Sequence, residues 1–383
     1  MNYTFLIQAL GRDRLKFDEP LSKHTYFKLG GPADLLYEAR TVDELTSAVQ
    51  SAILYKIPFL VIGGGSNILM SDSGFRGLVI KNKTAGIQLK GFAGGVEKGK
   101  LDLKEAIVQT DSGVTANLLI RYTLDQGLSG LEEMLGLPGS VGGAVYNNSH
   151  HLDKLFGDHI IEVEVLDFEG KIKKYTQKDC QFDYDYSVFH KTKEVILSAS
   201  FQLKRGDKDE LWAIANEAVK RRATTQPLGI PSSGCLFKNI PLADAMRLGT
   251  PDTTQSVGYL LDKAGLKGLR VGGASVSDVH ANFIVNDGTA TSQDVLDLIK
   301  LIKSKIKVEY GVDLTEEVII IAWYNSCMTS FKIIGGTPLK GAVRLGGAKN
   351  ASFKLMIASA CGEGESRLLN MSKIGDVDVT FKT

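Results

Sequence analysis

The sequence predicts an α/β protein, because helical and strand-like apolar patterns alternate along the chain. Residues 291–310 carry the clearest helical pattern, and an apolar strand pattern follows at residues 318–323. Residues 41–53 and 58–62 form a second pair of helix and strand. The apolar face of the 291–310 helix consists of Val295, Leu298, Ile299, Ile302 and Ile306.

Capping and turn signals define several further elements. Thr41 and Glu44 form a capping box, in which Thr41 accepts from the Glu44 amide and Glu44 reaches back to the cap. The strand at residues 58–62 is apolar throughout, which predicts a fully buried strand. The other expected elements are short strands and loops over 84–114, a helix over 115–126 with Leu118, Leu119 and Tyr122 inward, a hairpin over 161–175 and a helix over 209–222.

Composition excludes several classes of protein. The chain has 383 residues, enough for two or three domains, and 45 basic against 44 acidic residues leave a net charge of +1. This balance predicts neither nucleic-acid binding nor attachment to an anionic membrane, and no apolar run approaches the ~18 residues that span a bilayer. The four cysteines lack a Cys-x-x-Cys pair, and the N-terminal apolar segment is too short for a signal peptide, so we expect a cytoplasmic protein.

Glycine is unusually common, at 41 residues, and it is clustered. One cluster follows the 58–62 strand and a second lies about 70 residues later; each alone could be a tight turn. Two clusters beside apolar strands favour a large phosphate-bearing ligand, because backbone without Cβ atoms can approach phosphates closely. The candidate cofactor-binding residues are Gly63, Gly64, Gly65, Ser66, Asn67, Gly136, Pro138, Gly139, Gly142, Gly143 and Ala144.

Other candidates are single side chains. Cys235 follows a glycine beside Lys238, and it is either a small buried residue or a proton donor or nucleophile with a cation nearby. Of Glu316 and Glu317, at the start of the 318–323 strand, one must point inward if the strand alternates, although a solvated strand end would look the same. Tyr184 could stack on a ring or lie on a surface strand. The six histidines show no paired spacing, so no metal site is expected.

Taken together and in order, these segments resemble the UDP-N-acetylenolpyruvoylglucosamine reductases, in their shorter subtype, over about residues 20–324. The resemblance implies an FAD-binding fold of the vanillyl-alcohol-oxidase (PCMH) type with a separate α/β substrate lobe. The lobes expected from it are residues 1–82, to which the strand at 312–324 returns, residues 83–206 for the rest of the FAD-binding part, and residues 207–311 for the substrate.

The resemblance also implies a reaction. NADPH reduces FAD, and hydride then passes to the enolpyruvyl group of UDP-N-acetylglucosamine enolpyruvate to give UDP-N-acetylmuramate, a peptidoglycan precursor. The two glycine clusters match the FAD-contacting loops of the family. Cys235 stands where the family has a proton-donating Ser, and Glu317 matches its catalytic Glu. Tyr184, Lys238 and Asn239 fall on the substrate side.

Two departures from the family pattern concern the site. Asp185 occupies the position of an Arg that stabilises negative charge on the substrate, and Arg270 and Lys238 are candidates for a replacement cation. Residues 147–152 are rebuilt relative to the family loop. These changes support an alternative, a catalytically impaired protein that binds FAD or the UDP-sugar. A flavin oxidase that uses oxygen is a third interpretation, which residues 232–239 and Glu317 disfavour.

The C-terminal tail has a different resemblance. Residues 328–383 resemble the N-terminal segment of UDP-N-acetylglucosamine enolpyruvyl transferases, and Lys349 and Asn350 end its matching motif. Fifty-six residues of a much larger protein cannot close that protein's core, so no second activity is expected from this truncated piece. The sequence predicts no oligomeric state.

Overall fold

The computed structural model describes residues 2–97, 100–151 and 154–321. The chain divides into two compact units, Met1–Trp323 and Tyr324–Thr383. The predicted transferase-like tail, residues 328–383, lies outside the described residues. In the part of the chain that the structure describes, no helix is long and apolar enough to cross a membrane.

The N-terminal part of the first unit is built on a four-stranded sheet in the order β1-β2-β5-β3. Strands β2 and β3 both run parallel to β5, and helix α2 packs its apolar face against β2 and β5. The last described strand, β18, returns to pair in parallel with β4. These elements are α1 (Thr4–Leu10), β1 (Leu15–Pro20), β2 (Pro32–Ala39), α2 (Val42–Leu54), β3 (Phe59–Ile62), β4 (Ile68–Met70), β5 (Phe75–Asn82) and β18 (Ile319–Ile321).

The middle of the chain forms an antiparallel sheet in the order β12-β11-β13-β7-β6, with β8 beside β13. Its core is shared with α3, α4 and the first turns of α6, which contributes Leu211 and Ala215. The predicted lobe boundary at residue 207 would assign α6 to the substrate lobe instead. The elements are β6 (Ile87–Glu97), β7 (Lys100–Asp111), α3 (Ala116–Asp125), β8 (Leu128–Ser129), α4 (Val141–Asn147), β9 (His150–His151), β10 (Lys154–Leu155), β11 (Ile160–Leu166), β12 (Ile172–Thr176), α5 (Phe189–Thr192), β13 (Val195–Arg205) and α6 (Lys208–Thr225).

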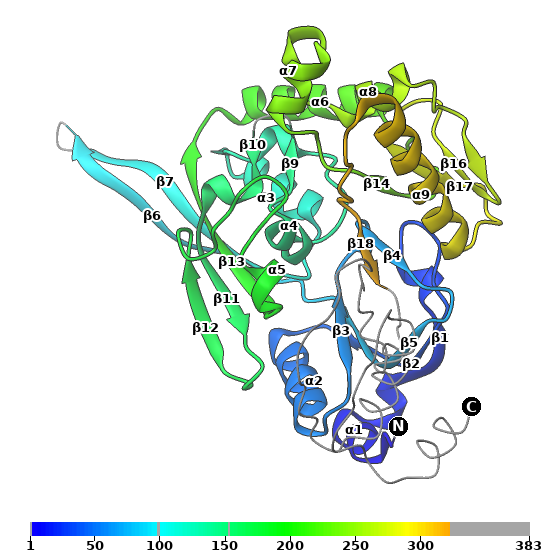
Figure 1. The fold of residues 1–383 in the computed structure, drawn as a ribbon. Coiled ribbons are helices and arrows are strands. Elements are labelled where there is room, and N and C mark those ends of the chain that lie inside the picture. The colour runs from blue at the N-terminus through cyan, green and yellow to red at the C-terminus, as the bar shows by residue number, and fades with distance from the viewer. Residues whose placement is uncertain (1, 98–99, 152–153, 322–383) are drawn as a thin grey trace, which may run out of the picture. The chain divides into compact units, whose positions relative to one another are not determined.

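The third sheet has the order β14-β17-β16-β15 and is covered by α9, which contacts β15 and β16 (Figure 1). Its core also takes in apolar residues of α8 and the start of the final strand segment. Each strand of this sheet is short, so the long helix supplies much of the buried apolar surface. The elements are β14 (Ser232–Cys235), α7 (Leu242–Leu248), α8 (Val257–Lys263), β15 (Arg270–Val271), β16 (Ala274–Val276), β17 (Phe283–Asn286) and α9 (Ser292–Tyr310).

Several predicted elements are confirmed. Helix α9 buries all five residues of the predicted face, and Gly311 ends it in the left-handed conformation at φ +69°. The hairpin of β11 and β12 is also present. Thr41 caps α2 by accepting from the Glu44 amide, but Glu44 accepts from the Arg40 amide, one residue before the cap.

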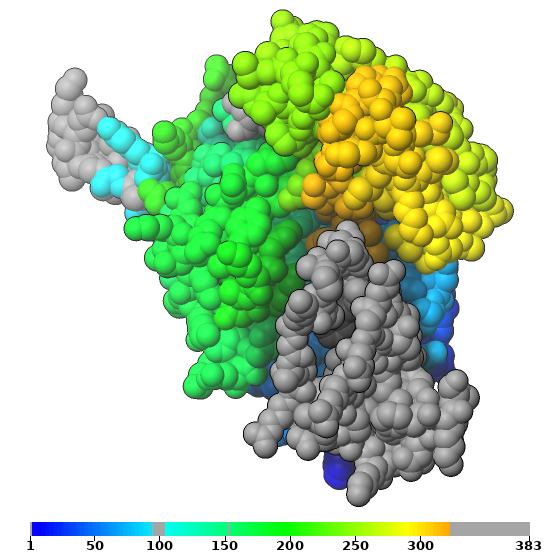
Figure 2. All heavy atoms as spheres, viewed as in Figure 1, coloured from blue at the N-terminus to red at the C-terminus, as the bar shows by residue number. Residues whose placement is uncertain are grey.

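Three details were predicted wrongly. Residues 84–114 are not short strands and loops, because β6 and β7 form one long hairpin. Gly91 and Gly94 lie at irregularities in its pairing. The cyan part of the hairpin projects from the middle of the chain in Figure 2. Leu118 is 49% exposed, since α3 turns Leu119 and Ile120 to the core. Strand β3 is half-buried because its residues also line a cavity, as described below.

Asp72 joins the N-terminal sheet to the start of α9. Its Oδ2 accepts from the backbone amide of Ser292 at 2.7 Å and from the Ser292 hydroxyl at 2.8 Å. The Asp72 amide in turn donates to the Ser292 hydroxyl at 3.0 Å. This reciprocal contact satisfies an otherwise orphan amide in the first turn of the helix.

We expect Asp72→Ala to lower the free energy of unfolding by about 1–3 kcal/mol, because two hydrogen bonds to a charged group are lost. Urea unfolding followed by fluorescence measures this change. Asp297→Ala is the matched control, since Asp297 is an exposed α9 carboxylate paired with Lys300, and its loss should cost under about 0.5 kcal/mol. Equal effects of the two substitutions would contradict the assigned role of Asp72.

Candidate functional site

A cavity of about 1270 Å³ is lined by residues from the N-terminal, middle and third sheets. This volume exceeds that of a typical small-ligand pocket and suits a large ligand or two ligands. Every residue predicted to bind a cofactor, from both glycine clusters, lies on its wall. The wall also includes Cys235, Glu317, Asp185, Tyr184 and Asn239, whereas Lys238 is not among its lining residues.

The two glycine clusters lie against each other at backbone distance. A Cβ atom on Gly64 would lie 2.6 Å from the Gly139 Cα, and one on Gly63 would lie 2.0 Å from the Ser140 Oγ. Gly139 itself has φ +105°, a conformation that other residues rarely adopt. The Ser140 hydroxyl caps α4 by accepting from the Gly143 amide at 3.3 Å. The sequence thus needs glycine here to let two loops form one continuous wall.

Arg222 contributes an unpaired buried cation to this wall. It is 7% exposed, and its Nε and Nη2 have no hydrogen-bond partner among the described residues. Gly136 leaves room for it, because a Cβ there would lie 2.9 Å from the Arg222 Cδ. Burial lowers the pKa of this guanidinium, yet an arginine stays charged. A buried cation of this kind requires an anionic partner in the cavity.

Arg222 was not among the residues predicted for the site. The helix predicted over residues 209–222 ends on three basic residues, a composition that suits a solvent-facing helix C-terminus. In α6, however, the buried positions are Leu211, Ala215, Ala218 and Arg222, at helical spacing on one face. An arginine at an apolar position of the repeat was the signal that could have found it.

Cys235 and Glu317 are brought together by the return of the chain to β14. The Glu317 amide donates to the Leu236 carbonyl at 2.8 Å, which fixes residue 317 beside the end of β14. Burial, together with the charges of Glu317 and Asp185, raises the pKa of the Cys235 thiol above its usual range. The thiol therefore keeps its proton at neutral pH. The Lys238 Nζ donates to the Asp185 carbonyl at 2.8 Å, and Arg222 is the cation whose charge opposes the rise in the Cys235 pKa.

Of the two neighbouring acids, Glu317 is the one that lines the cavity, whereas Glu316 pairs with Lys303 at 2.8 Å. Burial and the nearby Asp185 charge raise the pKa of Glu317 to about 8, and Lys238 opposes this shift. Around neutral pH Glu317 is therefore largely a neutral acid that can donate a hydrogen bond. With the usual glutamate pKa of 4.5, the side chain would be a carboxylate at neutral pH.

Asp185 is 3% exposed and adopts φ +47°, a left-handed conformation that aspartate tolerates better than most residues. Its Oδ1 lies 3.1 Å from the Nδ1 of His150, and its Oδ2 has no hydrogen-bond partner among the described residues. His150 comes from the rebuilt loop, so that loop and the substituted position contact each other. The sequence shows both departures from the family pattern, Asp185 and the 147–152 loop, but not the contact between them.

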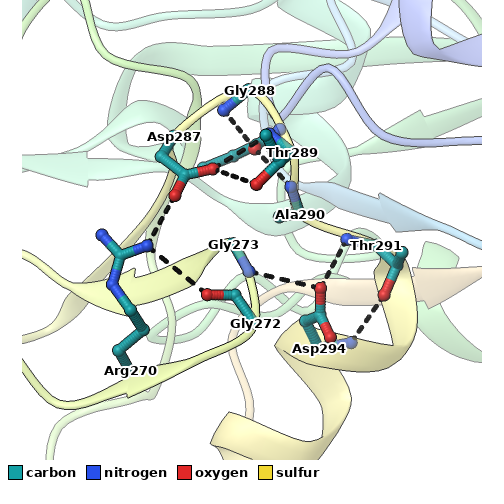
Figure 3. A network of polar contacts seen from close by, with 10 residues as sticks. Arg270, Gly272, Gly273, Asp287, Gly288, Thr289, Ala290, Thr291 and Asp294 are labelled. Atoms are coloured by element: carbon teal, nitrogen blue, oxygen red, sulfur yellow. Dashed lines mark hydrogen bonds and ion pairs between the residues drawn. The ribbon is translucent and has the colours of Figure 1, made fainter.

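Arg270 does not serve as the replacement cation. It forms an ion pair with Asp287 and donates to the Gly272 carbonyl in a network around the start of α9 (Figure 3). In that network Asp294 accepts from the amides of Gly273 and Thr291. Arg270 is absent from the described lining of the cavity, and its charge is already neutralised by Asp287. This candidate from the sequence analysis was wrong.

Comparison with known proteins first defines the class. Residues 33–176 match the family described as FAD binding domain, which makes the N-terminal half a flavin-binding fold. Residues 226–321 match the family described as UDP-N-acetylenolpyruvoylglucosamine reductase, C-terminal domain. The fold predicted from the sequence, an FAD-binding domain with a separate α/β lobe, is confirmed.

The chain belongs to the UDP-N-acetylenolpyruvoylglucosamine reductase family. It is 34% identical to the reductase of Clostridioides difficile, over 83% of this chain and 97% of that protein. It is 37% identical to the reductase of Chlamydia felis, over 79% of this chain and 93% of that protein. The crystal structure of UDP-N-acetylenolpyruvylglucosamine reductase (MurB) from Thermus caldophilus superimposes with a TM-score of 0.62 at 31% identity, covering 79% of this chain and 97% of that one.

We expect Gly64→Ala to separate the two glycine loops, because its Cβ would meet backbone atoms of Gly139 that cannot move aside singly. The expected result is protein purified with a markedly lower flavin content, with unfolding free energy lowered by about 1–3 kcal/mol. The flavin-to-protein absorbance ratio measures the first effect. Gly91→Ala is the control, since a Cβ on Gly91 meets nothing within 4 Å; unchanged flavin content in Gly64→Ala would refute the close approach.

We expect Glu317→Gln to gain stability relative to the wild type as pH rises. The unfolded carboxyl ionises near pH 4.5, whereas the folded one holds its proton to about pH 8. Wild-type stability therefore falls across this window, and a glutamine does not share the loss. Thermal unfolding without the sugar nucleotide should show the Tm difference growing by a few degrees from pH 5 to 8.5. Glu316→Gln should show no such growth, and a flat difference for Glu317→Gln would contradict the burial of that carboxyl.

Proposed function

We propose that this chain reduces UDP-N-acetylglucosamine enolpyruvate to UDP-N-acetylmuramate in peptidoglycan precursor synthesis, with FAD as cofactor and NADPH as reductant. Membership of the reductase family supports this activity. One observation in this chain supports the same activity: Cys235 and Glu317 line one cavity, and both glycine loops line it too. The cytoplasmic location stays a prediction from the sequence.

The residues of the cavity fit FAD. Gly63, Gly64 and Gly139 let the two loops pack at backbone distance into one wall of a cavity that is large enough for a dinucleotide cofactor. Arg222 offers a buried guanidinium without a partner among the described residues, which suits an anionic part of the cofactor or of the sugar nucleotide. When bound there, FAD would supply hydride chemistry between NADPH and the vinyl carbon of the substrate.

The side chains of the protein supply the proton that the reduction needs. Reduction of the carbon–carbon double bond adds hydride to one carbon and a proton to its neighbour. We assign the proton to the Cys235 Sγ–H, because Cys235 lines the cavity together with Glu317 and its thiol is protonated at neutral pH. Glu317 is also protonated near neutrality, and its hydroxyl can donate to the substrate oxygen on which negative charge develops. Tyr184, Lys238 and Asn239 remain predicted substrate-side residues.

Anaerobic NADPH oxidation by flavin-loaded protein, with and without the enolpyruvyl sugar nucleotide, tests this proposal. We expect substrate-dependent turnover in the wild type and a loss of about 10²–10⁴-fold in Cys235→Ala, the usual size of a general acid's contribution. Cys235→Ser is the matched variant, because a hydroxyl can donate a proton from the same place, and it should retain far more activity. Flavin reduction by NADPH should be unchanged in both variants.

Other outcomes would decide between the alternatives. Flavin that NADPH reduces, but that the sugar nucleotide cannot reoxidise in the wild type, would establish the catalytically impaired protein. Oxygen consumption without the sugar nucleotide would instead establish an oxidase. Full activity in Cys235→Ala would leave the reductase in place and remove Cys235 as the proton donor.

A further inference from the structure

The rebuilt loop places His150 on the cavity wall beside a buried carboxylate. Its Nδ1 lies 3.1 Å from Oδ1 of Asp185, whose side chain is 4% exposed. The His150 ring also packs against Tyr184, with ring centroids 4.6 Å apart. Both His150 and Asp185 line the cavity that contains Cys235 and Glu317. The other nitrogen of the ring, Nε2, has no hydrogen-bond partner within residues 2–97, 100–151 and 154–321.

The surrounding backbone holds this pair in place. Asn148, which ends α4 at φ +48°, donates from its side chain to the Asp183 carbonyl at 2.9 Å. The Lys238 Nζ donates to the Asp185 carbonyl at 2.8 Å. The Ser187 hydroxyl donates to the Tyr146 carbonyl at 2.6 Å. The chain around His150 is therefore tied to the 183–187 segment at two points, and Lys238 holds that segment from a third part of the chain.

The His150 ring lies where it can bridge two carboxylates. A ring that carries a proton on both nitrogens can donate twice, so Nδ1–H can bond Asp185 while Nε2–H bonds a second, incoming carboxylate. The second Asp185 oxygen, Oδ2, has no hydrogen-bond partner among the described residues. The titratable groups that contact the pair or act on it electrostatically are Tyr184, Lys238, His151, His190, Cys235 and Glu317.

Other cations near the site are engaged or lie elsewhere on the wall. The Lys238 ammonium is held by the Asp185 carbonyl, and the Lys193 Nζ is bonded to the Tyr146 hydroxyl at 3.0 Å. Arg222 packs beside Gly136, and its charge acts on Cys235 and His151. Of these side chains, His150 is the one that contacts the Asp185 carboxylate.

We propose that His150, oriented by Asp185, binds the carboxylate of the substrate's enolpyruvyl group, with His150 as the contacting residue and Asp185 as a positioning residue. This inference rests on the proposed function for the identity of the substrate. It assigns to two side chains of this chain the anion-binding task that a single arginine would perform. The carboxylate is the part of the substrate that the parent UDP-N-acetylglucosamine lacks, so the two ligands distinguish this contact from the rest of the site.

The test compares two ligands on the flavin-loaded full chain. In His150→Gln, which keeps a hydrogen-bonding side chain but no charge, the Kd and KM for the enolpyruvyl sugar nucleotide should rise roughly 10–100-fold. The Kd for UDP-N-acetylglucosamine, measured by calorimetry, should change less than about threefold. Asp185→Asn preserves the left-handed backbone, and it should weaken binding of the carboxylate-bearing ligand in the same selective way.

Coupling and a control complete the experiment. The double variant His150→Gln with Asp185→Asn should bind no more weakly than His150→Gln alone, because the second residue acts through the first. His24→Gln is the matched control, since His24 also contacts a carboxylate, Glu19 at 3.0 Å, outside the described lining of the cavity. It should leave both affinities unchanged.

The outcomes separate this inference from the proposed function. Equal weakening of both ligands in His150→Gln, or no weakening of either, would overturn the carboxylate site even if the wild type turns over. Failure of the wild type to oxidise NADPH with substrate would overturn the proposed function. In that event, selective loss of the carboxylate-bearing ligand in His150→Gln would still support the binding role of His150.

Discussion

The candidate site depends on the return of the last described strand to β4. Strand β18 pairs in parallel with β4, and the Ile319 amide donates to the Asn67 carbonyl at 3.1 Å. The Asn67 side chain donates to the Glu317 carbonyl at 3.3 Å, while the Glu317 amide is held by Leu236. Residue 317 is thus fixed between the 63–67 glycine loop and the end of the strand that carries Cys235. These contacts hold the acid near the thiol and anchor it to the loop that carries the first glycine cluster.

Opposite charges act together on the thiol in the cavity wall. The buried Asp185 raises the pKa of Glu317 and of Cys235, so both groups are protonated at neutral pH. Arg222, beside Gly136, carries a buried positive charge that opposes the rise at Cys235. The same wall therefore combines protonated groups with a cation that can hold an anionic part of a ligand.

Much of the fold could be predicted because it follows local rules. The α9 face, its cap and its glycine stop are all encoded within about twenty consecutive residues, and both glycine clusters are visible as composition. The length of the β6–β7 hairpin could not be predicted, because strand pairing across glycine-rich irregularities is a long-range property. Leu118 was misplaced since a short amphipathic helix has two plausible inward faces.

The site was harder to predict than the fold. The glycine clusters, Cys235 and Glu317 were visible as candidates in the sequence, while their roles came from a family resemblance that fixes positions but not surroundings. Lys238 was expected beside the thiol, yet its long side chain reaches a carbonyl in another segment. The contact between His150 and Asp185 joins residues 35 positions apart in the chain, and sequence alone shows no pairing between them. Arg222 was hidden because buried arginines are rare enough to be taken for surface residues.

The backbone of Asp185 limits which residues this position can accept. At φ +47° an aspartate is tolerated, but a long unbranched side chain there would cost about 1 kcal/mol of backbone strain. An arginine at this position would also remove the carboxylate that contacts the His150 ring. Residues 150 and 185 are therefore coupled, and an arginine at position 185 would fit only together with another residue at position 150 and another local chain conformation.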